Sequence, residues 1–71
     1  MKKTLKIEGM MCEHCEASVK KALEALPFIA TAIPNHNTNS CAVELSDESA
    51  WDEALVKATI EGKDYKYLGE A

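Results

Sequence analysis

Residues 4–15 read TLKIEGMMCEHC, and this stretch joins a strand pattern to a helix pattern through a short loop. Polar and apolar side chains alternate from residue 4 to residue 8, with Leu5 and Ile7 on one face, which predicts a half-buried strand. Gly9 ends this strand and opens the loop. Cys12 and Cys15 follow three positions apart, where the helix pattern begins. The stretch therefore predicts a strand-to-helix connection that presents two thiols.

The helix pattern extends from about Glu13 to Leu26 and predicts an amphipathic helix. Lys20 and Lys21 fall outside its apolar stripe, and we expect them on the solvated face. Pro27 stops the helix, because a proline disfavours helical geometry in the residue before it. The apolar residues that form the stripe are Cys15, Val19, Ala22, Leu23 and Leu26.

Two further strands are predicted in the middle of the chain. Residues 28–34 are apolar and partly β-branched, and Pro34 cannot donate a ladder hydrogen bond, so this strand is expected at a sheet edge. Residues 35–40 form a polar turn in which asparagines tolerate positive φ. The third strand is indicated by the alternating apolar residues Cys41, Val43 and Leu45.

A second helix and a last strand complete the chain. The polar residues 46–49 can cap this helix, and Ser49 with Asp52 resembles a capping box. Gly62 is a natural C-terminal stop, and Tyr65–Leu68 predicts a short strand. The predicted buried stripe of the helix is Trp51, Leu55 and Ala58, with Ala54 and Thr59 as further candidates.

This element order predicts an α+β fold: a ferredoxin-like βαββαβ sandwich with a four-stranded antiparallel sheet and two helices on one face. Right-handed crossovers then place the cysteine loop at one end of the sheet. The length of 71 residues fits one domain, residues 1–71. Such a small domain buries a modest fraction of its surface, so its stability margin is thin.

Composition argues against several functional classes. A formal net charge of −4 argues against nucleic acid, because nucleic-acid binding depends on Lys and Arg that neutralise phosphates. No apolar run approaches the roughly 20 residues that span a bilayer, so membrane insertion is not expected. The basic start lacks the apolar segment of a signal peptide, which predicts a cytoplasmic protein. Three cysteines, an odd number, do not fit a secreted disulfide framework.

The pattern Gly-Met-x-Cys-x-x-Cys at residues 9–15, between a first strand and a first helix, is similar to that of the heavy-metal-associated domain. That family includes bacterial copper chaperones and the N-terminal domains of copper-transporting ATPases, and the resemblance covers nearly the whole chain. It implies that Cys12 and Cys15 are the metal ligands. It also implies that Met10 is a buried anchor under the loop and that Tyr65 lies beside the loop. Family core positions are matched by Val19, Leu23, Val43 and Leu55.

Two thiolates suit Cu(I), because a soft ion favours sulfur ligands. Backbone amides and the dipole at a helix start favour the thiolate form of a nearby cysteine, so we expect Cys15 to gain most and Cys12 to be the more mobile ligand. An ion with few ligands leaves room for an incoming thiolate. These properties predict a non-enzymatic carrier of Cu(I), or of Ag(I), Hg(II), Cd(II) or Zn(II), which such a pair can also bind.

The resemblance implies a copper-transporting ATPase or another metal-accepting protein as the partner. The carrier is expected to be a monomer, and a metal shared between the loops of two copies is the route to a dimer. The main alternative is a thioredoxin-like thiol oxidoreductase that cycles a Cys12–Cys15 disulfide. A stand-alone metal sensor that acts on a separate partner also remains open.

A half zinc site is a further alternative, in which Cys41 or His36 completes the ligand set. The alternation of Cys41 with neighbouring apolar residues favours a small buried side chain instead. His36 lies in a polar turn and is assigned no role. Met11 and His14 are expected to be solvated residues of the loop.

Overall fold

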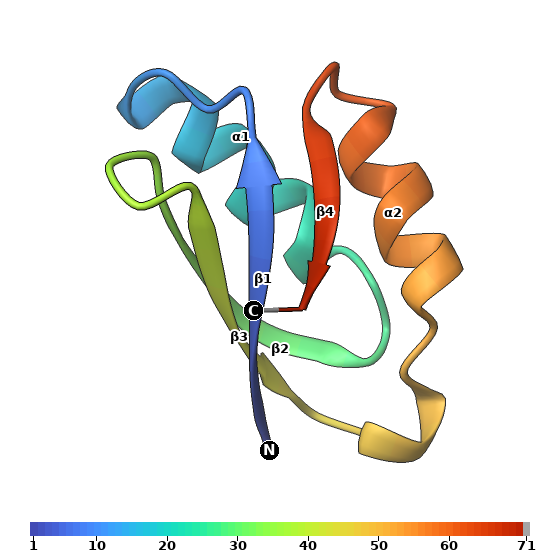
Figure 1. Cartoon of the computed structure of the whole chain (residues 1–71). Helices are drawn as coiled ribbons and strands as arrows, with labels where there is room; N and C mark the ends of the chain where they lie inside the picture. The colour runs from blue at the N-terminus through green and yellow to red at the C-terminus, as the bar shows by residue number, and fades with distance from the viewer. Residues whose placement is uncertain (71) are drawn as a thin grey trace.

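A computed structural model of the chain describes residues 1–70. Within that range it contains four strands, two α-helices and a single 3-10 turn (Figure 1). The predicted ferredoxin-like fold is therefore confirmed. The elements are β1 (Lys2–Glu8), α1 (Glu13–Glu24), β2 (Ile29–Asn35), β3 (Ser40–Leu45), η1 (Glu48–Ala50), α2 (Glu53–Glu61) and β4 (Lys66–Glu70).

The strands form one antiparallel sheet in the order β2-β3-β1-β4. β2 lies at the edge, as Pro34 predicted. The connection between β1 and α1, the β2–β3 turn and the α2–β4 connection all lie at the same end of the sheet (Figure 1). The sheet thus brings three segments that are far apart in the sequence to the cysteine loop.

One face of the sheet is buried and the other is exposed. In β1, Leu5 and Ile7 are fully buried, whereas Lys6 between them is exposed. Leu5 lies opposite Cys41 of β3 in the β1–β3 register. Cys41 is fully buried, as its alternation pattern predicted. The core between sheet and helices also includes the α1 residues Val19 and Leu23.

The ends of several elements differ from the predicted ones by a few residues. α1 ends at Glu24, two residues before the expected Leu26, and Ala25 is its C-cap. Because Pro27 disfavours helical geometry in the residue before it, the helix closes ahead of Leu26. β2 begins one residue after Phe28, and the last strand, β4, covers Lys66–Glu70 instead of the predicted Tyr65–Leu68.

The start of the second helix was predicted wrongly. Asp52, not Ser49, is the N-cap of α2, and its side chain accepts a hydrogen bond from the Leu55 backbone N–H at 3.2 Å. Ser49 belongs to the separate turn η1, where Asp47 is the N-cap and accepts from the Ser49 N–H at 3.1 Å. Gly62 is the C-cap of α2, as expected.

The buried face of α2 is also different from the prediction. Val56 and Ile60 are buried, whereas Leu55 is 41% exposed and Ala58 is exposed. The predicted stripe started from Trp51, which lies before the helix in an extended conformation and is half-buried against Phe28, with ring centroids 5.8 Å apart. A stripe counted from a residue outside the helix is out of phase with the helix itself.

The corrected phase of α2 predicts a clear difference between two substitutions that remove similar side chains. Ile60→Ala is expected to lower the free energy of unfolding by about 2–5 kcal/mol, because it leaves a cavity in the core. Leu55→Ala is expected to lower it by less than about 1 kcal/mol, since this side chain is largely solvated. Urea unfolding followed by circular dichroism measures both values, and a larger loss for Leu55→Ala would contradict the assignment.

Candidate functional site

The loop between β1 and α1 begins with a glycine that no other residue replaces easily. Gly9 has φ +106°, in the region that L side chains rarely adopt. A Cβ atom at this position would also lie 3.2 Å from Cδ1 of Tyr65. Tyr65 therefore packs directly against the loop, which is the position that the family resemblance implied.

The next two residues of the loop lie on opposite sides of it. Met10 is buried, with 4% of its surface exposed, and joins the hydrophobic core. Met11 is 82% exposed. The predicted anchor role of Met10 is therefore confirmed. Met11 and His14 are both exposed, as expected for solvated loop residues.

Cys12 is the N-cap of α1, with an extended backbone, and its carbonyl accepts a hydrogen bond from the Glu16 N–H at 3.1 Å. Its side chain makes no capping hydrogen bond within the part of the chain that the structure describes. Cys12 is exposed, and Cys15 is half-buried in the first turn of the helix. One thiol thus faces solvent while the other lies against the protein.

The surroundings of Cys15 favour its thiolate. The pKa of Cys15 is lowered first by a hydrogen bond from the Tyr65 side chain and next by the Met11 backbone N–H, while partial burial opposes both. The Cys12 thiol lies close enough to contribute a further hydrogen bond. The expected direction of the shift is therefore confirmed. The sequence did not reveal Tyr65 as its first cause.

Cys41 and His36 do not join this pair. Cys41 is fully buried, and burial raises the pKa of its thiol to about 11. The Nδ1 atom of His36 lies 2.5 Å from Oε2 of Glu16. Across residues 1–70 no group of three or more His, Cys, Asp or Glu side chains is arranged to hold a metal ion. The geometry therefore does not favour a half zinc site.

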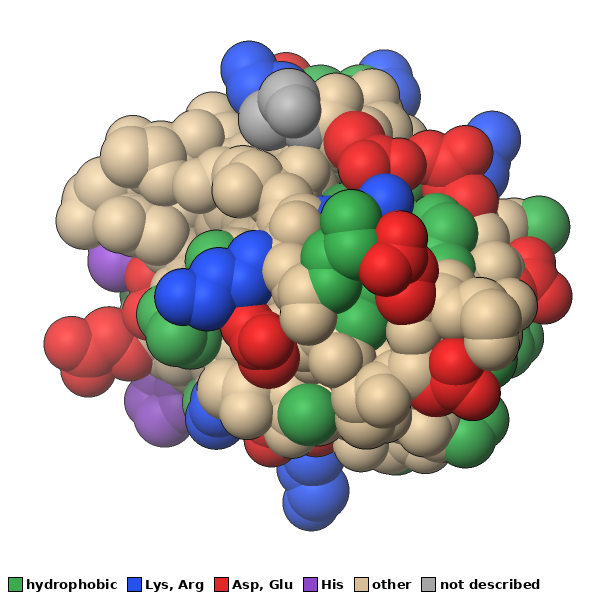
Figure 2. Space-filling view, turned by 90° about the horizontal axis from the view of Figure 1, so that it is seen from below, with side chains coloured by type: hydrophobic (Ala, Val, Ile, Leu, Met, Phe, Trp, Pro, Cys, Tyr) green, Lys and Arg blue, Asp and Glu red, His purple; other side chains and the backbone are tan. Residues whose placement is uncertain are grey.

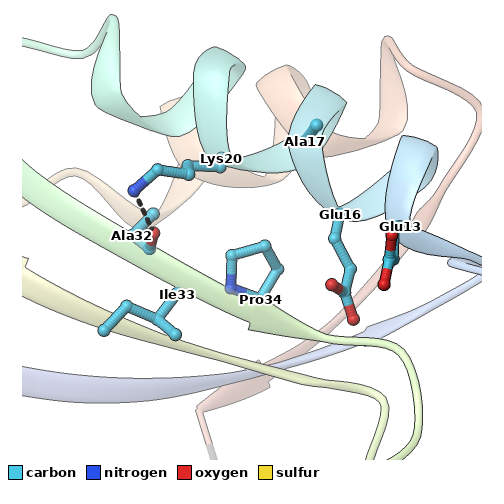
Figure 3. A pocket seen from close by; sticks show the side chains of 7 residues that line it. All are labelled: Glu13, Glu16, Ala17, Lys20, Ala32, Ile33 and Pro34. Carbon is cyan, nitrogen blue, oxygen red and sulfur yellow. Dashed lines mark hydrogen bonds between the residues drawn. The ribbon is translucent and has the colours of Figure 1, made fainter.

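A shallow groove runs beside α1 between the helix and β2 (Figure 3). Lys20 reaches from the helix to the carbonyl of Ala32 at 3.0 Å, and Glu13 and Glu16 extend from the first turn toward the same strand. Lys20 is exposed, as predicted for the solvated face of the helix, and it also pairs with Glu24 at 2.7 Å. The first turn of α1 therefore carries acidic side chains beside the cysteines.

The end of the molecule opposite the cysteine loop has a mixed surface. Acidic and basic side chains alternate there, with small hydrophobic areas between them (Figure 2). This face carries no large area of one charge sign.

Comparison with known proteins agrees with this geometry. The profile of the heavy-metal-associated domain matches residues 4–66. The chain belongs to the heavy-metal-associated domain family. The copper chaperone CopZ of Staphylococcus epidermidis is 38% identical to it over 63 residues, which cover 89% of this chain and 91% of the chaperone.

The domain also occurs within larger proteins. Copper-transporting ATPase 2 of Rhizobium meliloti is 39% identical over 62 residues, which are 87% of this chain and 7% of the ATPase. Among solved structures, a CopZ metallochaperone superposes with a TM-score of 0.87 at 28% identity, covering 96% of this chain and all of that one. The same domain thus occurs as a small protein and as part of a transporter.

Membership of the heavy-metal-associated family does not favour the thioredoxin-like alternative, although both folds can place a Cys-x-x-Cys pair between a strand and a helix. In the described part of the domain, the three cysteines are free thiols. No helix among residues 1–70 is long and apolar enough to cross a membrane.

The hydrogen bond between Tyr65 and Cys15 predicts that Tyr65→Phe raises the pKa of Cys15. The ring stays against Gly9, but the hydroxyl that favours the thiolate is lost. Alkylation of Cys15 therefore needs a higher pH, which peptide-resolved mass spectrometry measures across a pH series. Tyr67→Phe is the control, because the Tyr67 hydroxyl donates to Oε2 of Glu53 at 2.8 Å and not to the cysteine pair. Matching alkylation profiles for the two variants would refute the assignment.

Proposed function

We propose that this domain, as a single unit of residues 1–71, binds Cu(I) through Cys12 and Cys15 and transfers it to a partner protein. The observation that carries the proposal is the pair of adjacent thiols at the exposed start of α1, one of which has a lowered pKa. Cu(I) is soft and is bound well by thiolates. Binding releases the thiol protons, so a thiol that deprotonates readily assists uptake near neutral pH.

The unequal exposure of the two cysteines supports an order for the transfer. A thiolate of the partner first forms a bond to Cu(I), and the bond from Cys12, the exposed ligand, then breaks. A second partner thiolate follows, and the bond from Cys15 breaks last, because this residue is half-buried and is reached by the partner later than the exposed Cys12. Copper stays in the +1 state throughout, so no oxidant or reductant is needed.

Two ligands are few enough for this exchange to be fast. Structural zinc sites use four protein ligands and are closed, which holds the metal in place. Here Cys41 is buried in the core, so it does not serve as a third ligand. The ion therefore stays accessible from the side of the loop. We propose that the domain acts as a carrier and not as an enzyme, and that its working unit is a monomer.

The similarity to a copper chaperone and to a copper-transporting ATPase supports a copper-accepting protein as the partner. Ag(I), Hg(II), Cd(II) and Zn(II) also bind thiolate pairs, so competition among these ions is the direct way to rank them. The cytoplasmic location expected from the sequence stays a prediction.

Titration of the reduced protein with Cu(I) in the presence of a competing chelator tests the proposal. Cys12→Ser and Cys15→Ser are each expected to weaken binding by at least about 100-fold, since loss of a group that merely supports a ligand already costs 10–100-fold. Cys41→Ser is the matched control and is expected to bind as tightly as the wild type once its fold is verified. Wild-type affinity in both Cys12→Ser and Cys15→Ser would contradict the proposal.

An insulin-reduction assay separates the carrier from a thiol oxidoreductase. A carrier is expected to show no turnover above the rate of the Cys12→Ser protein. Metal-independent turnover that requires both cysteines would instead favour the oxidoreductase.

A further inference from the structure

The β2–β3 turn, residues 36–39, has no role in the proposed function, yet it lies at the same end of the sheet as the cysteine loop (Figure 1). It contacts the chain on both sides of that loop. One contact is to the end of β1, just before the loop, and the other is to the first turn of α1, just after it. A segment that holds both flanks of a loop restricts the separation of its ends.

The contact before the loop is a backbone hydrogen bond. The Ile7 N–H donates to the carbonyl of Asn39 at 2.9 Å. Asn39 has φ +53°, a left-handed conformation that asparagine tolerates better than most residues. The turn is also held internally, by Asn37 N–H donating to Oδ1 of Asn35 at 2.9 Å and by a 2.6 Å hydrogen bond between the hydroxyls of Thr38 and Ser40.

The contact after the loop is made by Glu16, the residue that follows Cys15. Its Oε2 atom accepts a hydrogen bond from the His36 backbone N–H at 2.7 Å and lies 2.5 Å from Nδ1 of the same residue. The two side chains are 24% and 27% exposed, so water competes weakly for this contact. Both the backbone and the ring of His36 are thereby attached to the helix turn that carries Cys15.

A second glutamate on α1 makes a comparable contact at the far end of the helix. Glu24 accepts from the Ala32 N–H at 2.9 Å and pairs with Lys20, which donates to the Ala32 carbonyl. Glu16, Lys20 and Glu24 are spaced by four residues, so they lie along one side of α1 facing β2. Glu16 and Lys20 extend toward this strand in Figure 3. The helix is therefore attached to the edge strand at both ends, and only the Glu16 end adjoins the cysteines.

We infer that Glu16 is a positioning residue and that, with the turn 36–39, it forms a brace that holds Cys12 and Cys15 in place for the ion. This inference rests on the proposed function for the effect on Cu(I) binding. The ordering of the loop by the brace does not depend on that function. A loop whose ends are already fixed is ordered when the chain folds. Less conformational entropy is then lost when the ion binds, which raises affinity.

The comparison of Glu16→Ala with Glu24→Ala tests the brace. Each substitution removes a half-buried carboxylate of α1 that accepts a backbone hydrogen bond, from the turn in the case of Glu16 and from β2 in the case of Glu24. Backbone ¹⁵N relaxation of the metal-free protein reports loop order, and Cu(I) competition with a chelator reports affinity. In Glu16→Ala the order parameters of residues 10–15 are expected to fall from about 0.85 toward 0.6. Its Cu(I) affinity is expected to fall about tenfold.

Glu24→Ala is expected to keep the wild-type order of residues 10–15 and the wild-type Cu(I) affinity. Equal order parameters in the two variants would overturn the brace, whether both loops stay rigid or both become mobile. If the wild-type protein does not bind Cu(I), the proposed function fails, and the relaxation comparison still decides whether the brace exists.

Should Glu16→Ala not fold, His36→Ala provides the test, because it keeps the backbone N–H and removes only the ring contact. Residues 10–15 are expected to lose order to a smaller degree, and His36→Asn is expected to restore it, since the asparagine amide can donate to Glu16 in place of Nδ1. A fully rigid loop in a folded His36→Ala protein would overturn the inference.

Discussion

The burial of Met10 beneath an otherwise exposed loop is the constraint on which the site depends. A short connection that presents thiols to solvent has few contacts of its own and would be mobile. Met10 places one side chain of this connection in the core, where 4% of its surface remains exposed. Gly9 makes the turn that this requires, and Tyr65 packs against it. The cysteines can then be accessible without being disordered.

The same packing makes the two cysteines chemically different. Tyr65 packs against the loop at Gly9, and its side chain is the first cause of the lowered pKa of Cys15, so this half-buried thiol ionises more readily. Cys12 extends away as the N-cap of α1. A pair with one half-buried thiol and one exposed thiol suits the proposed stepwise transfer better than a symmetric pair. The chemistry of the site therefore follows from how the loop is packed as well as from the presence of two sulfurs.

Local patterns in the sequence predicted most of the fold. Alternation identified the faces of β1 and β3, Pro34 placed β2 at the edge, and Gly62 ended α2. The phase of α2 was missed because Trp51 is apolar and helix-spaced with Leu55 but lies in extended backbone before the helix. An aromatic side chain that packs on the core from a loop leaves the same sequence signal as one on a helix face.

The cysteine pair was predictable for a related reason, since the loop and both thiols lie within one short stretch. The family resemblance placed Met10 and Tyr65 at the loop, but neither the effect of Tyr65 on Cys15 nor the contact between His36 and Glu16 was predicted. Tyr65 reaches Cys15 across 50 positions of sequence, and His36 reaches Glu16 across 20. No periodicity relates residues so far apart. They meet because the sheet order brings the α2–β4 connection and the β2–β3 turn to the end of the sheet where β1 meets α1.

X-ray absorption at the copper edge, on protein loaded anaerobically with one equivalent of Cu(I), tests the central claim most directly. The account predicts a first shell of two sulfur atoms in the wild type and in Cys41→Ser, with one sulfur lost in Cys12→Ser. A first shell made of nitrogen or oxygen, or a sulfur count unchanged by the loss of Cys12, would contradict it.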